Sequence, residues 1–227
     1  DPILKERLFG LTNAEGNHGE DVKEYYFYVD ATPTSSYLKY RYRYPLEGYP
    51  YADLVDTNAR RGKLEMEYEL LDTGVFDRDQ YVDVDVEYAK AALDDVHIRI
   101  TLSNRGEEGA TVHLLPTLWY RNTWSWGCIH EGCWVKPRMR RAGPGEVATE
   151  HVTLGKVRWL AEGDAELLFT DNESNLEALW GVTNLGPHVK DAFHRHVVAG
   201  EASAVHPKGL GTKAAAHFRF TLAPGES

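Results

Sequence analysis

Residues 81–88 have the sequence YVDVDVEY, in which three valines, Val82, Val84 and Val86, alternate with the acidic residues Asp83, Asp85 and Glu87. A period of two places alternate side chains on opposite faces of a β-strand. We therefore predict a strand whose valines face a core and whose carboxylates face water. Residues 96–102, VHIRITL, have the same pattern, with Val96, Ile98, Ile100 and Leu102 predicted to face inward. Strands with one buried and one wetter face usually pair antiparallel.

The same alternation recurs along the chain and predicts a protein made mostly of β-strands. Gly-containing turns at 104–106, 142–145 and 162–164 separate several of these segments. The predicted strands are 25–29, 37–44, 64–70, 81–88, 96–102, 111–119, 147–154, 157–161, 166–170 and 214–222.

Helical patterns are few. One short helix is predicted over 52–61, with Asp53 as a candidate N-cap and Gly62 as its end, and another over 188–198, ended by Gly200. Together these patterns predict a large antiparallel β-sandwich with one or two short helices. Its 227 residues fit a single domain spanning 1–227.

Composition narrows the classes of function. A net charge of −10 argues against binding nucleic acid, whose phosphates such a surface repels. The sequence has no apolar run near ~20 residues, so we predict no membrane span. With two cysteines, the chain is not a disulfide-built secreted scaffold, and we predict a cytoplasmic protein. The first residues, Asp1 and Pro2, and a turn-like end at 223–227 suggest a piece of a longer protein.

Residues 112–126 are the richest in aromatic side chains. Three of the six tryptophans, Trp119, Trp124 and Trp126, fall within eight residues and alternate with polar residues that include Arg121 and Asn122. Flat rings cover the C–H faces of sugars, and amide or guanidinium donors reach sugar hydroxyls. The same composition suits a buried contact with another domain, since Trp combines a large apolar body with one polar group.

A second aromatic segment covers residues 37–53 and holds six of the 13 tyrosines. Within it, Tyr49 and Tyr51 flank a proline, which predicts an exposed, stiff loop. Exposed aromatic side chains on a loop favour a covering ligand or domain. The alternative for the strand tyrosines is ordinary packing in the core.

Carboxylates are abundant, so pairs of them are weak signals. Asp77 with Asp79 and Asp94 with Asp95 are typical of turns beside strands. Residues 171–175, DNESN, follow a predicted strand and could bind a sugar or a cation, or form a loop whose polar groups satisfy one another.

Two places in the sequence offer candidate metal ligands. His18 lies in a Gly-flanked polar loop with acidic neighbours. Cys128, His130 and Cys133 offer three soft ligands without a fourth at zinc spacing, so two thiols or a hairpin pair are the alternatives. We predict neither a metal nor another cofactor. The sequence carries no nucleophile elbow, phosphate-binding loop or dinucleotide fingerprint.

Longer segments carry a resemblance that covers essentially the whole chain. They resemble the N-terminal region of bacterial glucosidase-like proteins of glycoside hydrolase family 63. The segments are KERLFGLTN (5–13), GNHGEDVKEYY (16–26), YPYADL (49–54), LLPTLWYRNTWSWG (114–127), KDAFH (190–194) and GTKAAAH (211–217).

The resemblance implies an N-terminal β-sandwich, of the kind called a super-sandwich, followed by an (α/α)6 barrel. Members cleave α-glucosidic or related bonds with inversion, and both carboxylates that do so lie in the barrel. This chain ends where the barrel should begin. The resemblance therefore implies no catalytic residue here, inactivity of this chain alone, and the chain's own C-terminal catalytic domain as its partner.

On this hypothesis the candidate residues Tyr49, Tyr51, Arg121, Asn122, Trp124 and Trp126 face the barrel or contact sugar. Two alternatives belong to other classes of protein. One is a free-standing carbohydrate-binding module with an oligosaccharide as its partner. The other is a β-sandwich metal enzyme that uses His18 or His130.

Overall fold

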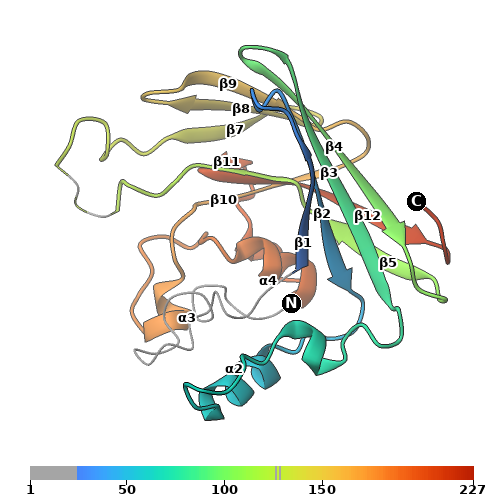
Figure 1. Cartoon of the computed structure of the whole chain (residues 1–227). Coiled ribbons are helices and arrows are strands. Elements are labelled where there is room, and N and C mark those ends of the chain that lie inside the picture. The colour runs from blue at the N-terminus through green and yellow to red at the C-terminus, as the bar shows by residue number, and fades with distance from the viewer. Residues whose placement is uncertain (1–24, 126, 128) are drawn as a thin grey trace. The chain divides into compact units, whose positions relative to one another are not determined.

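The computed structural model describes residues 25–125, 127 and 129–227, and these residues form a mostly β structure with three antiparallel sheets (Figure 1). The chain divides into two compact units. The first unit is Ile3–Val112 with Thr221–Ser227, and the second is Asp1–Pro2 with His113–Phe220. A single domain over 1–227 stays a prediction. Within the described residues, no helix is both long and apolar enough to cross a membrane.

The first unit contains a four-stranded sheet in the order β1-β2-β3-β4. The predicted strands are confirmed, each with slightly wider bounds: β1 (Tyr25–Ala31), β2 (Tyr37–Pro45), β3 (Tyr81–Ala92) and β4 (Asp95–Asn104). The valines of β3 lie opposite tyrosines of β2, so that Val82 pairs with Tyr44 and Val86 with Tyr40. Both valines are buried, as their period of two predicts.

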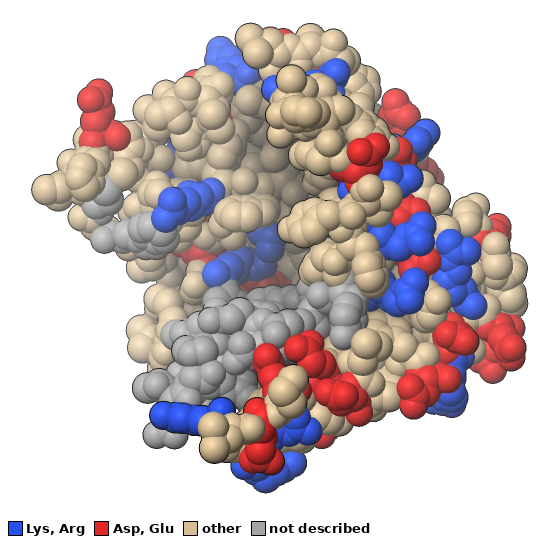
Figure 2. Space-filling view, viewed as in Figure 1, with Lys and Arg blue, Asp and Glu red and all other residues tan. Residues whose placement is uncertain are grey.

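The opposite face of β3 differs from its prediction. Asp83 is only 2% exposed, because Arg43 and Arg105 cover it with N–O distances of 3.2 and 3.0 Å. Asp85 similarly binds Arg41 through two hydrogen bonds of 2.7 and 2.8 Å. Opposite charges on neighbouring strands stabilise such a face without an apolar cover. Figure 2 shows lysine and arginine side chains intermingled with acidic ones along the right-hand side of the view.

The apolar face of β4 is only partly buried. Leu102 is buried as predicted, but Val96 and Ile98, which were expected to face inward, are about half exposed. These two residues lie toward the β3–β4 turn, where the neighbouring residues of β3 are also exposed. The prediction that Val96 and Ile98 face inward is therefore wrong for this end of the strand. Alternation shows which residues share one face of a strand, but it does not show whether other residues cover that face.

The predicted helix at 52–61 is confirmed as α2 (Tyr51–Arg60), whereas the predicted strand at 64–70 is wrong. Residues 66–69 are irregular and lead into the 3-10 helix η2 (Leu70–Thr73). Asn58 of α2 explains this difference, because its side chain donates to the Tyr68 carbonyl at 2.9 Å and accepts from the Tyr68 N–H at 2.7 Å. The amide takes the two backbone bonds that a neighbouring strand would have made.

Most of the second unit belongs to two further sheets, which pack as a sandwich. One sheet has the order β10-β12-β5, with β6 also paired to β12, and the other has the order β11-β7-β8-β9. Their facing side chains form one core of Tyr120, Met139, Val147, Leu167, Phe169, Ala214 and Ala216. The strands are β5 (Ala110–Leu114), β6 (Thr117–Trp119), β7 (Arg138–Gly143), β8 (Glu146–His151), β9 (Gly155–Leu160), β10 (Glu166–Thr170), β11 (Leu210–Gly211) and β12 (Lys213–Leu222).

Two departures from the predicted strands have clear causes. The strand predicted over 111–119 divides into β5 and β6 around Pro116, which has no N–H to donate to a ladder. Strand β7 was not predicted, because its sequence RMRRAG carries little alternation. Its place in the sheet comes from pairing with β8 and β11.

Short helices follow the sheets. The helix predicted over 188–198 is observed as α4 (Ala192–Ala199), and Gly200 ends it in the left-handed conformation with φ of 71°. Phe193 of α4 packs on Leu168 and Ala215, on the side of the sheet opposite the sandwich core. Helix α3 (Leu176–Trp180) and the 3-10 helix η3 (Ala202–Ala204) were not predicted.

Candidate functional site

Three loops of the second unit meet at Trp124. The loop after β6 supplies Trp124, the segment before β7 supplies Lys136, and the loop after β10 supplies Asp171 and Glu173. The Trp124 indole Nε1 donates to Glu173 Oε1 at 2.7 Å, and Lys136 Nζ donates to the same oxygen at 2.8 Å. Lys136 Nζ also donates to Asp171 Oδ2 at 2.7 Å. We call these four residues the Trp124 cluster.

Thr212, at the corner between β11 and β12, holds the acidic loop in place. Its Oγ1 accepts from the Asn172 N–H at 2.8 Å and lies 3.3 Å from Asp171 Oδ1. The Asn172 side chain in turn donates to the Tyr120 carbonyl at 2.9 Å, which joins the acidic loop to the aromatic segment. Loops held in this way by rigid strands are common places for binding residues.

Tyr120 connects the cluster to the sandwich core. Its ring is buried and stacks on His151 with centroids 4.8 Å apart, while its hydroxyl lies 2.6 Å from Thr149 Oγ1. Trp124 packs against the edge of the same core. The aromatic segment is therefore anchored from one side by apolar packing and from the other by hydrogen bonds.

Lys136 lies between the two negative charges of the cluster. Burial alone would lower the pKa of Lys136, but its hydrogen bonds to Asp171 and Glu173 outweigh that effect and raise it. The ammonium also lies 5.9 Å from the centre of the Trp124 ring, within reach of a cation–π contact. One cation between two carboxylates leaves one net negative charge beside an aromatic ring, an arrangement suited to polar, uncharged ligands.

The same geometry argues against acid–base catalysis at this place. An inverting glycosidase separates its two carboxyl groups by about 6.5–9.5 Å so that the bond to be cleaved and a water molecule fit between them. Here Lys136 occupies the space between Asp171 and Glu173 and contacts both. The cluster can hold a loop or accept hydrogen bonds from hydroxyls, and it lacks room for a scissile bond between its acids.

The predicted residues of the aromatic segment have different roles in the structure. Asn122 Oδ1 accepts from the Ser125 N–H at 3.2 Å and from its hydroxyl at 2.7 Å, so Asn122 forms the turn that presents Trp124. Arg121 is exposed. Trp126 lies outside the described residues, so its predicted role stays a prediction.

Tyr49 and Tyr51 lie in the first unit, and Tyr51 corrects the prediction of an exposed loop. Tyr51 is 5% exposed and is the first residue of α2. It packs with Leu54, Leu70 and Val75, and its ring centre lies 4.3 Å from that of Tyr49. The helix begins directly after Pro50 and carries the Tyr51 ring into this small core, which the local sequence pattern did not indicate.

The carboxylates that were predicted to belong to turns lie in turns or directly beside them. Asp77 lies in a run of turns, Asp79 directly follows that run, and Asp94 lies in the β3–β4 turn. In the part of the chain that the structure describes, no group of three or more His, Cys, Asp or Glu side chains is placed to hold a metal ion. His18 and Cys128 lie outside that part, so the hypotheses that use them stay untested.

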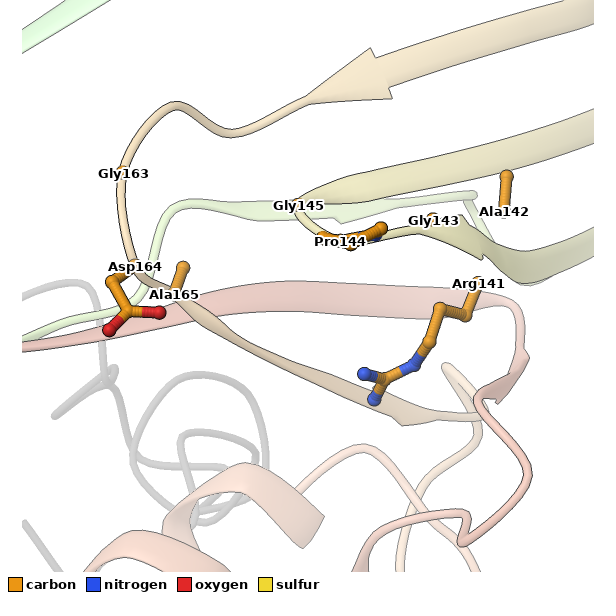
Figure 3. Close-up of a pocket in the computed structure, with 8 residues that line it drawn as sticks. All are labelled: Arg141, Ala142, Gly143, Pro144, Gly145, Gly163, Asp164 and Ala165. Carbon is orange, nitrogen blue, oxygen red and sulfur yellow. The ribbon is translucent and has the colours of Figure 1, made fainter.

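A pocket of about 500 Å³ lies elsewhere in the second unit, between the Ala142–Gly145 turn and the Gly163–Ala165 turn (Figure 3). Arg141 and Asp164 are the charged residues among its eight lining residues. The Arg141 guanidinium already donates to the Leu167 carbonyl at 2.8 Å and lies 5.8 Å from the Phe169 ring centre. The pocket therefore offers fewer polar and charged groups to a ligand than the Trp124 cluster does.

Two residues of the site were missed from the sequence. Lys136 is a single lysine between predicted elements, with no pattern to mark it. Thr212 falls within the segment 211–217 that contributes to the family resemblance, which was the one available signal. Both gain their roles from contacts with residues 35 to 41 positions away, which periodicity does not report.

Comparison with known proteins gives one informative match. The chain is 38% identical, over an alignment of 263 residues, to the uncharacterized protein YMR196W of Saccharomyces cerevisiae. The alignment covers all of this chain and 24% of the yeast protein, so the chain spans about a quarter of the length of that relative. No family model matches the sequence. No solved structure matches it either.

Proposed function

We propose that this chain is a non-catalytic β-sandwich domain of a cytoplasmic, inverting α-glycoside hydrolase of the glucosidase-like type. In that protein it packs against a catalytic (α/α)6 barrel and shapes the approach of substrate. The observation that carries the proposal is the alignment of the whole chain with only 24% of a much longer relative. The resemblance of segments along the entire sequence to family 63 supplies the reaction class.

The Trp124 cluster supports a role at the rim of a cleft. Trp124 is fixed by Glu173 and by the sandwich core, while Arg121 and Ser125 on the same loop are exposed. A loop held rigidly at its aromatic residue can present neighbouring polar side chains to another domain or to a sugar at low entropic cost. Because Lys136 separates Asp171 from Glu173, the acid and base of the reaction belong elsewhere in the longer protein.

The reaction class is tested with the full-length protein. Hydrolysis of α-linked glucose and mannose disaccharides is followed by NMR, which distinguishes the first anomer released. We expect β-glucose or β-mannose first, as inversion requires, and no release by this chain alone. Inactivity of the full-length protein on the whole panel would remove the hydrolase proposal, and an α-anomer released first would remove inversion.

The role of the aromatic loop is tested in the same protein with Arg121→Ala and Trp124→Phe. We expect the Michaelis constant to rise about three- to tenfold in at least one variant, because contacts that only position substrate act mainly on binding. Arg158→Ala removes an exposed ion pair with Glu146 on the β8–β9 hairpin and serves as the matched control. A Michaelis constant and turnover unchanged in both loop variants would contradict a role at the cleft.

A specific observation favours a second candidate, a carbohydrate-binding module. On one face of the β1–β2 pair, Tyr28 is 97% exposed, and Tyr26 and Tyr44 are about half exposed. Exposed rings on a sheet face are able to cover sugar rings. Calorimetric titration of the chain with malto- and manno-oligosaccharides tests this function. Binding that Tyr28→Ala abolishes would support the module, and absence of binding would leave the domain role as the better account.

A further inference from the structure

Two segments of the second unit hold the acidic loop that follows β10. One segment is residues 188–190, and its Lys190 N–H donates to the Glu173 carbonyl at 2.9 Å. The other segment is residues 206–212, and its last residue, Thr212, accepts a backbone N–H of the loop at 2.8 Å through its hydroxyl. The position of the acidic loop therefore depends on both segments.

A pair of histidines joins the two segments. His188 belongs to the first and His206 to the second, and their ring centroids lie 4.8 Å apart with the ring planes tilted by 53°. His188 Nδ1 lies 3.0 Å from the Ala204 carbonyl, which only accepts, so this nitrogen carries a hydrogen. His206 Nδ1 instead accepts from the Lys208 N–H at 3.2 Å, so it carries none. His206 is therefore neutral in this arrangement, with its hydrogen on Nε2.

The turn at residues 206–209 depends on the neutral form of His206. A proton on Nδ1 would direct one N–H at another, so the bond from Lys208 would be lost. The same turn is closed by the Gly209 N–H, which donates to the His206 carbonyl at 3.0 Å. The Arg141 guanidinium of β7 also faces this turn, since a Cβ at Gly209 would lie 3.2 Å from its Nε. A positive charge therefore already stands beside the turn before His206 is protonated.

The other groups around His206 act mainly against its protonation. Burial lowers the pKa of His206 below its ordinary value near 6.5, and the positive charges of His188 and Lys208 act in the same direction. Asp171 opposes them, but a salt bridge of 2.7 Å within the Trp124 cluster already occupies its carboxylate. Both rings are half-buried, so charges on them would repel more strongly than in bulk water. The two rings therefore stay together most readily while at least one of them is neutral.

We propose that the His188–His206 pair is a pH-sensitive latch on the acidic loop of the Trp124 cluster. With His206 neutral, the latch is closed and both segments hold the loop. When both rings are protonated, their repulsion and the lost Lys208 bond open the turn, and the acidic loop loosens. Because Glu173 accepts from the Trp124 indole, an open latch also loosens the aromatic loop. The latch does not depend on the hydrolase proposal.

The direction of the pH dependence follows from the lowered pKa of His206. The closed latch binds this proton less readily than the open one, in which the ring is free of its neighbours. Closure is therefore complete above the ordinary pKa near 6.5 and is lost as the pH falls below that value.

The test measures hydrogen–deuterium exchange of the Asn172 amide, which donates to Thr212, by NMR between pH 5.5 and 7.5. After correction for the intrinsic exchange rate, we expect protection at pH 5.5 to be about five- to tenfold lower than at pH 7.5, as release of one histidine with a pKa near 6.5 requires. The amides of β8, which lies between β7 and β9, report opening of the whole sheet and should lose less protection. A fall shared equally by β8, or no fall at Asn172, would overturn the proposal.

His206→Asn separates the turn bond from the charge. Its side-chain oxygen can still accept from the Lys208 N–H, as asparagine does in tight turns, but the side chain takes up no proton. We expect equal protection of Asn172 at both pH values in this variant, whereas His97→Asn, which removes an exposed histidine of β4, should keep the full response. A response retained in His206→Asn would overturn the latch. In the unaltered protein, so would a midpoint of loop opening that differs by more than about one pH unit from the midpoint of His206 titration.

Discussion

Trp124 serves the sandwich core and the polar loop with different parts of one side chain. Its ring packs at the edge of the core, and its Nε1 donates to Glu173, a carboxylate that also binds Lys136. A hydrogen bond to a charged acceptor is stronger than a neutral one. The position of the aromatic loop therefore depends on an indole N–H as well as on apolar area.

The indole N–H gives a first prediction. Trp124→Phe keeps a ring but removes the donor, so Glu173 retains only Lys136 in the cluster. We expect a loss of about 1–2 kcal/mol in the free energy of unfolding, measured with a chemical denaturant. Trp180→Phe, which alters an exposed ring on α3, is the control and should change stability by less than about 0.5 kcal/mol. An equal loss in the two variants would show that the bond to Glu173 contributes nothing.

Gly211 is required by a close approach rather than by an unusual backbone angle. A Cβ at this position would lie 2.1 Å from the Thr170 carbonyl oxygen, a backbone atom that cannot move aside cheaply. Gly211→Ala should therefore destabilise the protein by about 2–4 kcal/mol, as a lower midpoint of thermal unfolding. Gly186→Ala, where a Cβ meets nothing within 4 Å, is the matched control and should be nearly neutral. A Gly211→Ala variant as stable as this control would contradict the steric argument.

At the scale of elements, β5 and β12 carry a pair of histidines that depends on pH. His113 Nδ1 and His217 Nε2 lie 2.8 Å apart with stacked rings, so one of the two nitrogens must accept and remain unprotonated. Glu166 lies 3.7 Å from His217 and 3.9 Å from His196 of α4. Burial, the charge of His217 and the charge of Arg219 all lower the pKa of His113.

The sign of the pH dependence follows from that lowered pKa. The folded state binds the proton of His113 less readily than the unfolded state, whose pKa is near 6.5. The contribution of neutral His113 to the free energy of unfolding is complete above pH 6.5. It is lost as the pH falls below that value toward the pKa of His113 in the folded state. We expect His113→Gln to flatten the fall in unfolding free energy between pH 7 and pH 5.

His97→Gln controls for the loss of one histidine, because His97 is exposed near the start of β4. Its stability curve should keep the slope of the unaltered protein. A His113→Gln variant with that same slope would contradict the role assigned to the histidine pair.

At the scale of the whole molecule, large apolar side chains are unusually exposed. Trp119, Trp134 and Trp180 of the second unit are 55%, 55% and 54% exposed, and the first unit exposes Leu64 and Met66. Extensive exposed apolar surface is typical of places where another domain or protein binds. The proposed packing against the rest of a longer protein accounts for these side chains together.

Hydroxyl-radical footprinting measures that packing directly. If a neighbouring domain covers the second unit, at least one of the three tryptophans should be oxidised about threefold more slowly in the full-length protein than in this chain alone. Leu93, at the exposed β3–β4 turn, provides an internal reference for radical dose. Equal oxidation of all three tryptophans in the two proteins would place the interface away from them.

The sequence by itself determined most of the strands, because a period of two is a local property that burial on one side of a sheet imposes. It predicted β3 and β10 closely, and Gly200 correctly marked the end of α4. The resemblance along the chain determined the hypothesis for function, which no pattern of period or charge could supply.

Only the tertiary structure decided how those elements use their polar groups. The Asn58 amide takes the place of a neighbouring strand for Tyr68. Arginines on adjacent segments bury Asp83. Lys136 lies between Asp171 and Glu173 and contacts both. Each case depends on a partner distant in sequence, and a side chain's hydrogen-bond partner is set by three-dimensional proximity. Alternation records which face a residue occupies, but the energy of a buried charge depends on the atoms that contact it.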